Sequence, residues 1–296
     1  MRAADALGEA FAPRLPTRFG PKKFKIFAAA ICSVVIDEKM NPSQLPVILT
    51  FHSISEGDSP LKISPALFAE QMEWLKSNTQ VRPLGEVIAC LLEHRALPER
   101  TVVLTFDDGF RNFLDSAVPA LQRFDFPATV FLPSGYCGGT NSWPGQPDWV
   151  QREELLSWPE IDDLANRGFI FGAHTATHPM LTALSLAEAE REIKESKTAI
   201  EAHIRRSVEF FAYPFGSWNP GVRELVSKHF RASCSTGAGV IEPDADPFAL
   251  PRVDAHYVRN PYWFKKLFTG RFLTYLRARR LVRRLRRQPE GLYARV

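Results

Sequence analysis

Residue types that bind metals occur at two places in this 296-residue chain. Asp107 and Asp108 are adjacent, and His174 and His178 are four residues apart. Imidazole and carboxylate groups are common ligands of divalent metals. Two neighbouring aspartates can also divide the work, because one can bind the metal while the other acts as a base. These residues therefore favour metal-assisted acid–base chemistry.

Each pair alone is weak evidence for such a site. A spacing of four would put both imidazoles on one face of a helical turn, within reach of one ion. Thr175 stands at the second position, so the segment is not the HExxH motif of zinc peptidases. A helix cap and a turn residue would also explain the aspartates, although adjacent carboxylates repel each other unless a cation offsets their charge.

The elements that must position these residues alternate between short apolar strands and helices. The composition, 45% apolar and 24% charged, is that of a globular protein, and the four scattered cysteines form no disulfide framework or zinc finger. The predicted strands are 46–54, 101–106, 128–132, 169–173, 209–213 and 232–235, and the predicted helices are 64–77, 110–124, 152–167, 185–203 and 220–229. This α/β alternation predicts a parallel sheet closed as a barrel, with functional residues at the carboxyl ends of the strands.

Two motifs give the sequence a family resemblance. Residues 105–109 read TFDDG and residues 174–178 read HTATH. Both resemble signatures of the polysaccharide deacetylases, the NodB-homology proteins of carbohydrate esterase family 4, over about residues 46–258. The resemblance implies a distorted (β/α) barrel that hydrolyses N-acetyl groups of amino sugars, a cleavage of linear amide C–N bonds.

The resemblance also implies roles for individual residues. Asp108, His174 and His178 would hold a divalent metal, with zinc as the first candidate and nickel, cobalt or iron as alternatives. Asp107 would be the general base. The oxyanion of the reaction would be stabilised by the metal and by a backbone N–H after the TFDDG motif.

The sequence departs from the family pattern at two places. The third motif, usually of the form RPPYG, reads AYPFG at 212–216, so Ala212 stands where the base-orienting arginine is expected. Arg252 is our candidate for that role, and an ordinary structural ion pair is the alternative. No convincing late Leu-x-His motif is present. His52 instead resembles the early histidine of the poly-N-acetylglucosamine deacetylase branch, in which the motif order is permuted. It is our candidate acid, with a structural histidine as the alternative.

Five residues around the third motif are predicted to contact the substrate: Tyr213, Pro214, Phe215, Gly216 and Trp218. Aromatic side chains stack on sugar rings, so Trp143 and Trp149 in a predicted loop at the barrel mouth are further candidates. Packing of the loops would explain these tryptophans almost equally well.

Charge divides the chain into two unlike parts. Residues 259–296 hold 12 Lys and Arg and one acidic residue, whereas the rest holds 25 basic and 32 acidic residues. Apolar residues spaced by three or four between 264 and 285 predict one or two basic amphipathic helices. We expect residues 262–287 to bind an anionic membrane surface. A helix docked on the acidic body, a disordered end, an anionic glycan or a partner protein are the alternatives. No nucleic acid is expected, since no recognised module accompanies the charge.

The first 45 residues are predicted to be an extension that is helical or contacts a membrane. Residues 27–36 are apolar and follow three lysines, as in a signal peptide, but the run starts late and no clean cleavage site follows. No run reaches the roughly 18 apolar residues of a spanning helix. We favour the cytoplasm or the periphery of the inner membrane, with export to the periplasm as the alternative.

The predicted function is that of a metal-dependent hydrolase removing N-acetyl groups from a polysaccharide or its precursor, in exopolysaccharide production. Two other functions stay open. The departures from the motifs would suit a degenerate member that binds glycan without catalysis. A related barrel could also hydrolyse a non-sugar amide.

Overall fold

The computed structural model describes residues 41–147 and 149–286, with side chains described up to residue 280. The apolar segment 27–36 and nearly all of the predicted N-terminal extension lie outside the described residues. The same holds for the last ten residues of the predicted basic tail.

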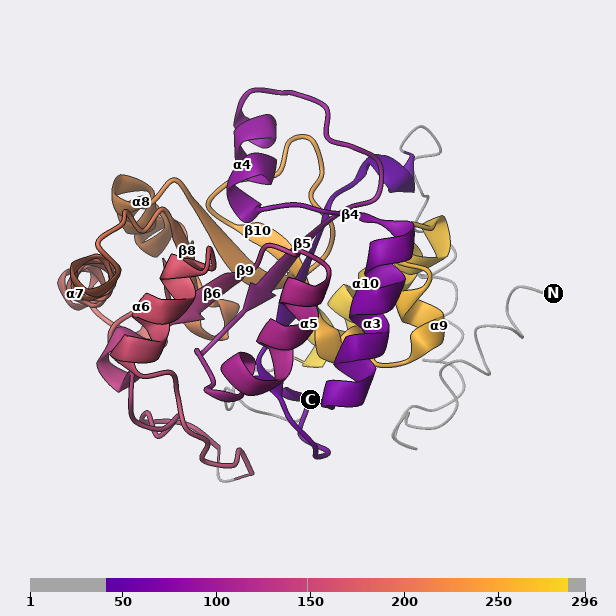
Figure 1. The fold of residues 1–296 in the computed structure, drawn as a ribbon. Helices are drawn as coiled ribbons and strands as arrows, with labels where there is room; N and C mark the ends of the chain where they lie inside the picture. Colours follow the sequence, from indigo (N-terminus) through magenta and orange to yellow (C-terminus); the bar gives the residue numbers. More distant parts are fainter. Residues whose placement is uncertain (1–40, 148, 287–296) are drawn as a thin grey trace. The chain divides into compact units, whose positions relative to one another are not determined.

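In the described part of the chain, seven parallel strands close into a barrel (Figure 1). In spatial order they are β1 (Val47–Phe51), β10 (Leu250–Asp254), β9 (Ala232–Ala238), β8 (Phe210–Ala212), β7 (Ile170–Ala173), β6 (Thr129–Leu132) and β5 (Thr101–Phe106). The ring closes where β1 pairs with β5, from Val47 opposite Val102 to Phe51 opposite Phe106. The short strand β4 (Gln80–Val81) extends β5, while β2 (Ser53–Ile54) and β3 (Lys62–Ile63) form a separate pair. The predicted barrel is confirmed.

Helices surround the barrel, with α6, α7 and α8 on one flank and α3 and α10 on the other (Figure 1). The described α-helices are α3 (Pro65–Asn78), α4 (Leu84–Leu92), α5 (Val118–Arg123), α6 (Trp158–Asn166), α7 (Leu186–Ile204), α8 (Pro220–His229), α9 (Pro261–Phe264) and α10 (Gly270–Arg286). Local signals set their starts. The hydroxyl of Ser64 caps α3, and Ser185 and Glu188 form a capping box at α7.

Two predicted helices begin later than the sequence suggested. The segment after the TFDDG motif starts with a π-helical turn at Phe113–Ala117 before α5. The helix expected from residue 152 begins only at Trp158. The preceding residues are extended, because Glu154 and Leu155 bridge to Thr140 and Phe110. Tertiary pairing therefore overrides the local helical pattern there.

The described part of the basic tail is packed onto the domain. Its apolar side chains Phe264, Leu267, Phe272 and Leu276 are all buried. Helix α10 packs against β9, where the Arg280 guanidinium donates to the carbonyl of Ala238. The part of the apolar stripe before residue 281 is thus used within the domain, so the membrane contact stays a prediction that depends on the basic side chains. No helix among the described residues combines the length and hydropathy of a membrane span.

Candidate active site

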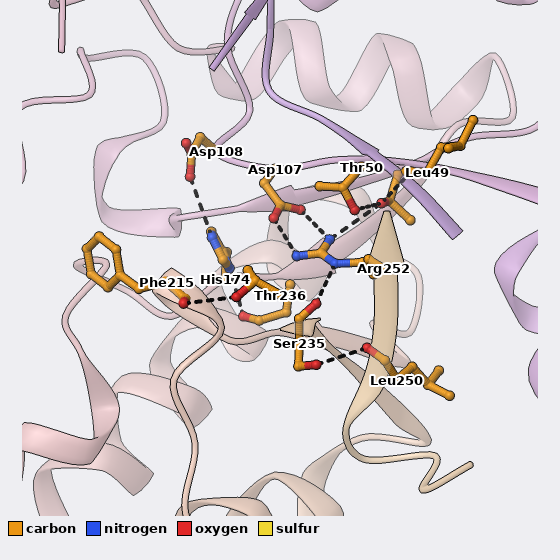
Figure 2. Close-up of polar contacts among 12 residues, drawn as sticks. Leu49, Thr50, Asp107, Asp108, His174, Phe215, Ser235, Thr236, Leu250 and Arg252 are labelled. Atoms are coloured by element: carbon orange, nitrogen blue, oxygen red, sulfur yellow. Dashed lines mark hydrogen bonds and ion pairs between the residues drawn. The ribbon is translucent and has the colours of Figure 1, made fainter. Parts of the chain in front are cut away.

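The carboxyl ends of the strands bring the candidate residues together (Figure 2). Asp107 and Asp108 follow β5, and His174 follows β7. Arg252, from β10, reaches the same end of the barrel. The two adjacent carboxylates point in different directions, Asp107 toward Arg252 and Asp108 toward His174 (Figure 2). The two carboxylates therefore have different partners.

A bidentate ion pair with Arg252 fixes the carboxylate of Asp107. The guanidinium of Arg252 donates to its two carboxylate oxygens at 2.7 and 2.6 Å, and both side chains are buried. Arg252 is itself anchored, since its Nε donates to the carbonyl of Ser235 at 3.0 Å. Burial alone raises the pKa of Asp107, but the charges of Arg252 and His174 outweigh it and hold that pKa below its usual value. The result is an ionised carboxylate in a fixed orientation.

Asp108, His174 and His178 form a buried cluster of metal-ligand types. The Nε2 atoms of the two histidines lie 3.2 Å apart, and Oδ1 of Asp108 lies 3.5 and 3.4 Å from them. Burial raises the pKa of Asp108, but the hydrogen bonds with both imidazoles outweigh burial and lower it. One carboxylate and two imidazoles that face one point are a donor set that suits zinc or a similar divalent ion.

The histidine pair lies on a loop and not on the helical turn that its spacing suggested. Thr175 and His178 have positive φ values of 67° and 60°, and Asp108 has a φ of 69°. Such backbone is unfavourable for residues with a side chain, and it clusters at functional sites. The two imidazoles therefore converge through an irregular backbone that the surrounding structure must hold in place.

Glu192 of α7 holds that loop and was missed by the sequence analysis. Its buried carboxylate accepts hydrogen bonds from the backbone N–H and the hydroxyl of Thr177 at 2.8 and 2.7 Å. Its carbonyl also accepts from the N–H of Ala176 at 3.1 Å. The available signal was its place on the buried face of α7, between Ala189 and Ser196, within a helix that otherwise looks charged.

The two histidines differ in their second contacts. Nδ1 of His174 donates to the carbonyl of Ala212 at 2.7 Å, and this contact directs Nε2 toward Asp108 and His178. Nδ1 of His178 is buried without a hydrogen-bond partner in the described part of the chain. Its ring instead lies against Trp143 and Phe215, with centroid distances of 4.2 and 4.8 Å.

His52 belongs to the same rim of the barrel. It directly follows β1, is partly exposed, and acts electrostatically on both Asp107 and Asp108. Its predicted role as the acid stays a prediction, and its location is compatible with that role.

The residues of the third motif have unlike environments. Tyr213 is fully buried and its hydroxyl donates to the carbonyl of Phe248 at 2.9 Å, while burial raises its pKa to about 12. A sugar cannot reach this side chain, so its predicted substrate contact does not fit the structure. Pro214 is also buried. A Cβ on Gly216, at a φ of 65°, would collide with Thr236, so this position requires glycine.

Phe215 and Trp218 keep ring surface available for a substrate. Phe215 is partly exposed and Trp218 is 39% exposed. Of the two loop tryptophans, Trp143 is buried and Trp149 is exposed. The predicted glycan contacts of Phe215 and Trp218 remain predictions.

Comparisons with known proteins agree with this geometry. Residues 94–230 match the sequence profile of the polysaccharide deacetylases. A poly-beta-1,6-N-acetyl-D-glucosamine N-deacetylase of Staphylococcus epidermidis is 26% identical over 217 residues, which are 69% of this chain and 72% of that protein.

Two solved structures show the same fold. IcaB from Ammonifex degensii superposes with a TM-score of 0.65 at 21% identity, covering 78% of this chain and 97% of that one. The deacetylase PplD from Streptococcus pyogenes gives a TM-score of 0.62 at 22% identity, covering 71% and 92%. The profile match thus identifies a polysaccharide deacetylase sequence pattern in residues 94–230, and the closed parallel barrel has the fold of these two solved structures.

Proposed function

We propose that this domain is a metal-dependent deacetylase that hydrolyses the N-acetyl amide of amino sugars in a glycan or its precursor. One observation carries the proposal. A buried, ionised carboxylate on Asp107, fixed by Arg252, stands directly beside a buried set of metal ligands at the carboxyl end of the barrel. A barrel without a functional site would need neither the buried carboxylate nor the buried ligand set at that place, because buried charges are costly.

The ligands suit zinc best, with nickel, cobalt or iron as alternatives. Asp108, His174 and His178 would hold the ion. When bound, it would supply polarisation of the acetyl carbonyl and a lower pKa for water. The protein's own contribution is the fixed orientation of these three side chains.

Asp107 is the proposed general base. Each of its oxygens accepts one hydrogen bond from Arg252, and each keeps a lone pair that can take a proton from the attacking water. The leaving nitrogen needs a proton, because an amide anion is a very poor leaving group. His52 on the same rim is the proposed donor of that proton.

The name of a relative and the side chains of the rim both support a glycan as the substrate class. The staphylococcal relative is named for poly-beta-1,6-N-acetyl-D-glucosamine, which makes β-1,6-linked N-acetylglucosamine oligomers the first substrates to test. Phe215 and Trp218 offer the ring surfaces on which sugars stack. The main argument for a degenerate glycan binder is weakened, because Arg252 contacts the base although Ala212 replaces the family arginine.

Acetate release tests the proposal. Zinc-loaded protein is incubated with β-1,6-linked oligomers, chitooligosaccharides, peptidoglycan fragments and simple acetamides. We expect release from at least one glycan, loss of release on chelation, recovery with added zinc, and a decrease of about 1,000-fold in Asp107→Asn. The matched control is Asp115→Asn, an exposed aspartate in the same segment.

Four outcomes would contradict the proposal. Activity that survives chelation, or full activity of Asp107→Asn, would exclude the mechanism. Binding of oligosaccharide without any acetate release would favour the degenerate binder. Release from acetamides alone would favour a non-sugar amidase.

A further inference from the structure

The two histidine ligands are oriented by different means. A metal-binding histidine usually donates its second ring N–H to an acceptor, which fixes the ring. His174 does so with the carbonyl of Ala212 at 2.7 Å, whereas Nδ1 of His178 is buried and has no partner among the described residues. The polar contacts of the His178 ring in the described part of the chain are all at Nε2, so packing must fix the Nδ1 side of the ring.

Two aromatic rings enclose that imidazole. The Trp143 ring lies 4.2 Å from it at an interplanar angle of 33°, and the Phe215 ring lies 4.8 Å away at 74°. Such ring pairs are favourable and depend on geometry. The ring of His178 thus has two close aromatic neighbours.

Trp143 is itself held firmly. Its indole packs with Phe110 and Leu155 in a small apolar cluster, and with Tyr136 at a centroid distance of 5.6 Å. It is only 6% exposed, which leaves almost no face for a sugar. A role in positioning a neighbour therefore fits Trp143 better than a role in stacking on substrate.

Glu153 fastens the loop that carries Trp143. Its carboxylate accepts hydrogen bonds from Ser53 and Asn112 at 2.9 and 3.0 Å and pairs with the ammonium of Lys62 at 3.0 Å. These partners come from the β2–β3 pair and from the segment after the TFDDG motif. The loop is therefore tied to two other parts of the barrel rim.

We propose that Trp143 is a positioning residue for His178. Its indole orients the imidazole of His178 by ring contact, whereas the Ala212 carbonyl orients the imidazole of His174 by a hydrogen bond. Phe215 contributes a second ring contact to the same imidazole. The inference rests on the proposed metal centre. It adds to that centre a residue of the loop around Trp143, which lies outside the motifs at 105–109 and 174–178.

Metal binding followed by tryptophan fluorescence tests the inference. The protein holds six tryptophans, and Trp143 touches a ligand ring, so Co²⁺ should quench its emission most strongly. We expect Trp143→Phe to lose most of the quenching, while Trp149→Phe, at an exposed position of the same loop, retains it.

Zn²⁺ affinity, measured by chelator competition, gives the energetic readout. We expect Trp143→Leu and Phe215→Leu each to weaken binding by about 10-fold, Trp143→Phe to weaken it less, and Trp149→Leu to leave it unchanged. Thermal unfolding without metal identifies a variant that fails to fold, and Phe215→Leu tests the ring contact without changing the loop.

The outcomes separate the two proposals. Unchanged Zn²⁺ affinity in folded Trp143→Leu and Phe215→Leu would overturn this inference and leave the metal centre intact. Equal losses in Trp143→Leu and Trp149→Leu would also overturn it. Absence of metal binding by the unaltered protein would instead overturn the proposed function.

Discussion

The two halves of the active site are held in place by different forces. Asp107, Arg252 and His174 form a strand-held half, in which an ion pair and hydrogen bonds to the backbone of β8 and β9 fix every polar group. His178 and Thr177 form a loop-held half, fixed by the carboxylate of Glu192 and by aromatic rings.

This difference follows from the barrel itself. A strand end is positioned by its neighbours in the sheet, so a side chain there needs only its own polar partners. A loop has no ladder of hydrogen bonds, so its backbone must be held by contacts from other elements. We therefore expect changes in the strand-held half to affect stability and catalysis together, and changes in the loop-held half to affect mainly metal affinity.

Removal of the arginine should have the largest effect. Arg252→Met leaves the carboxylate of Asp107 buried without its partner, which costs about 3–5 kcal/mol of folding free energy. Activity should fall by about 100-fold or more, because the base loses its orientation. Urea unfolding and acetate release measure the two effects.

The double variant Arg252→Met/Asp107→Asn serves as the control. Neutralising the carboxylate should recover much of the lost stability but none of the activity. Two stability losses that simply add would show that the ion pair does not couple these residues.

A change at His52 should be smaller because it affects catalysis alone. His52→Gln should slow amide hydrolysis by about 100-fold, through loss of the acid, with little change in the free energy of unfolding. Hydrolysis of 4-nitrophenyl acetate should be nearly unaffected, because its leaving group needs no proton. The control is His94→Gln, an exposed histidine between α4 and β5. Equal losses on the amide and the ester would contradict the acid role.

The smallest effect is expected in the loop-held half. Glu192→Gln keeps the shape of the side chain but cannot accept both hydrogen bonds from Thr177. Zn²⁺ affinity should fall by about 10-fold, with most of the activity restored at saturating zinc. Glu195→Gln, on the exposed face of α7, should leave both quantities unchanged. A loss of activity that saturating zinc cannot restore would contradict the division of roles.

The barrel could be predicted from sequence because its strands are buried on both faces and read as continuous apolar runs. The strand at 101–106 was placed at its observed bounds, and the capping box at Ser185 placed the start of α7. The carboxyl-end rule then grouped Asp107, Asp108 and His174 correctly.

Other features depend on tertiary contacts that a sequence does not display. Strand β10 contains a proline, an arginine and an aspartate, so its apolar pattern is weak and it was not predicted as a strand. The interior position of Arg252 becomes clear only once β10 is paired with β1 and β9. The place of Tyr213 in the motif suggested a substrate contact, but its side chain is buried and its hydroxyl donates a hydrogen bond to the backbone carbonyl of Phe248.

The late position of β10 in the sequence affects the order in which the site can form during synthesis of the protein. Arg252 lies 145 residues after Asp107 and is supplied by the last strand to enter the barrel. While the chain emerges from the ribosome, amino end first, Asp108, His174 and His178 are all synthesised before Arg252. Until β10 closes against β1, a buried Asp107 would lack the cation that keeps it charged. The order of translation thus makes the ion pair between Asp107 and Arg252 one of the last contacts of the site to form, because that pair waits for β10.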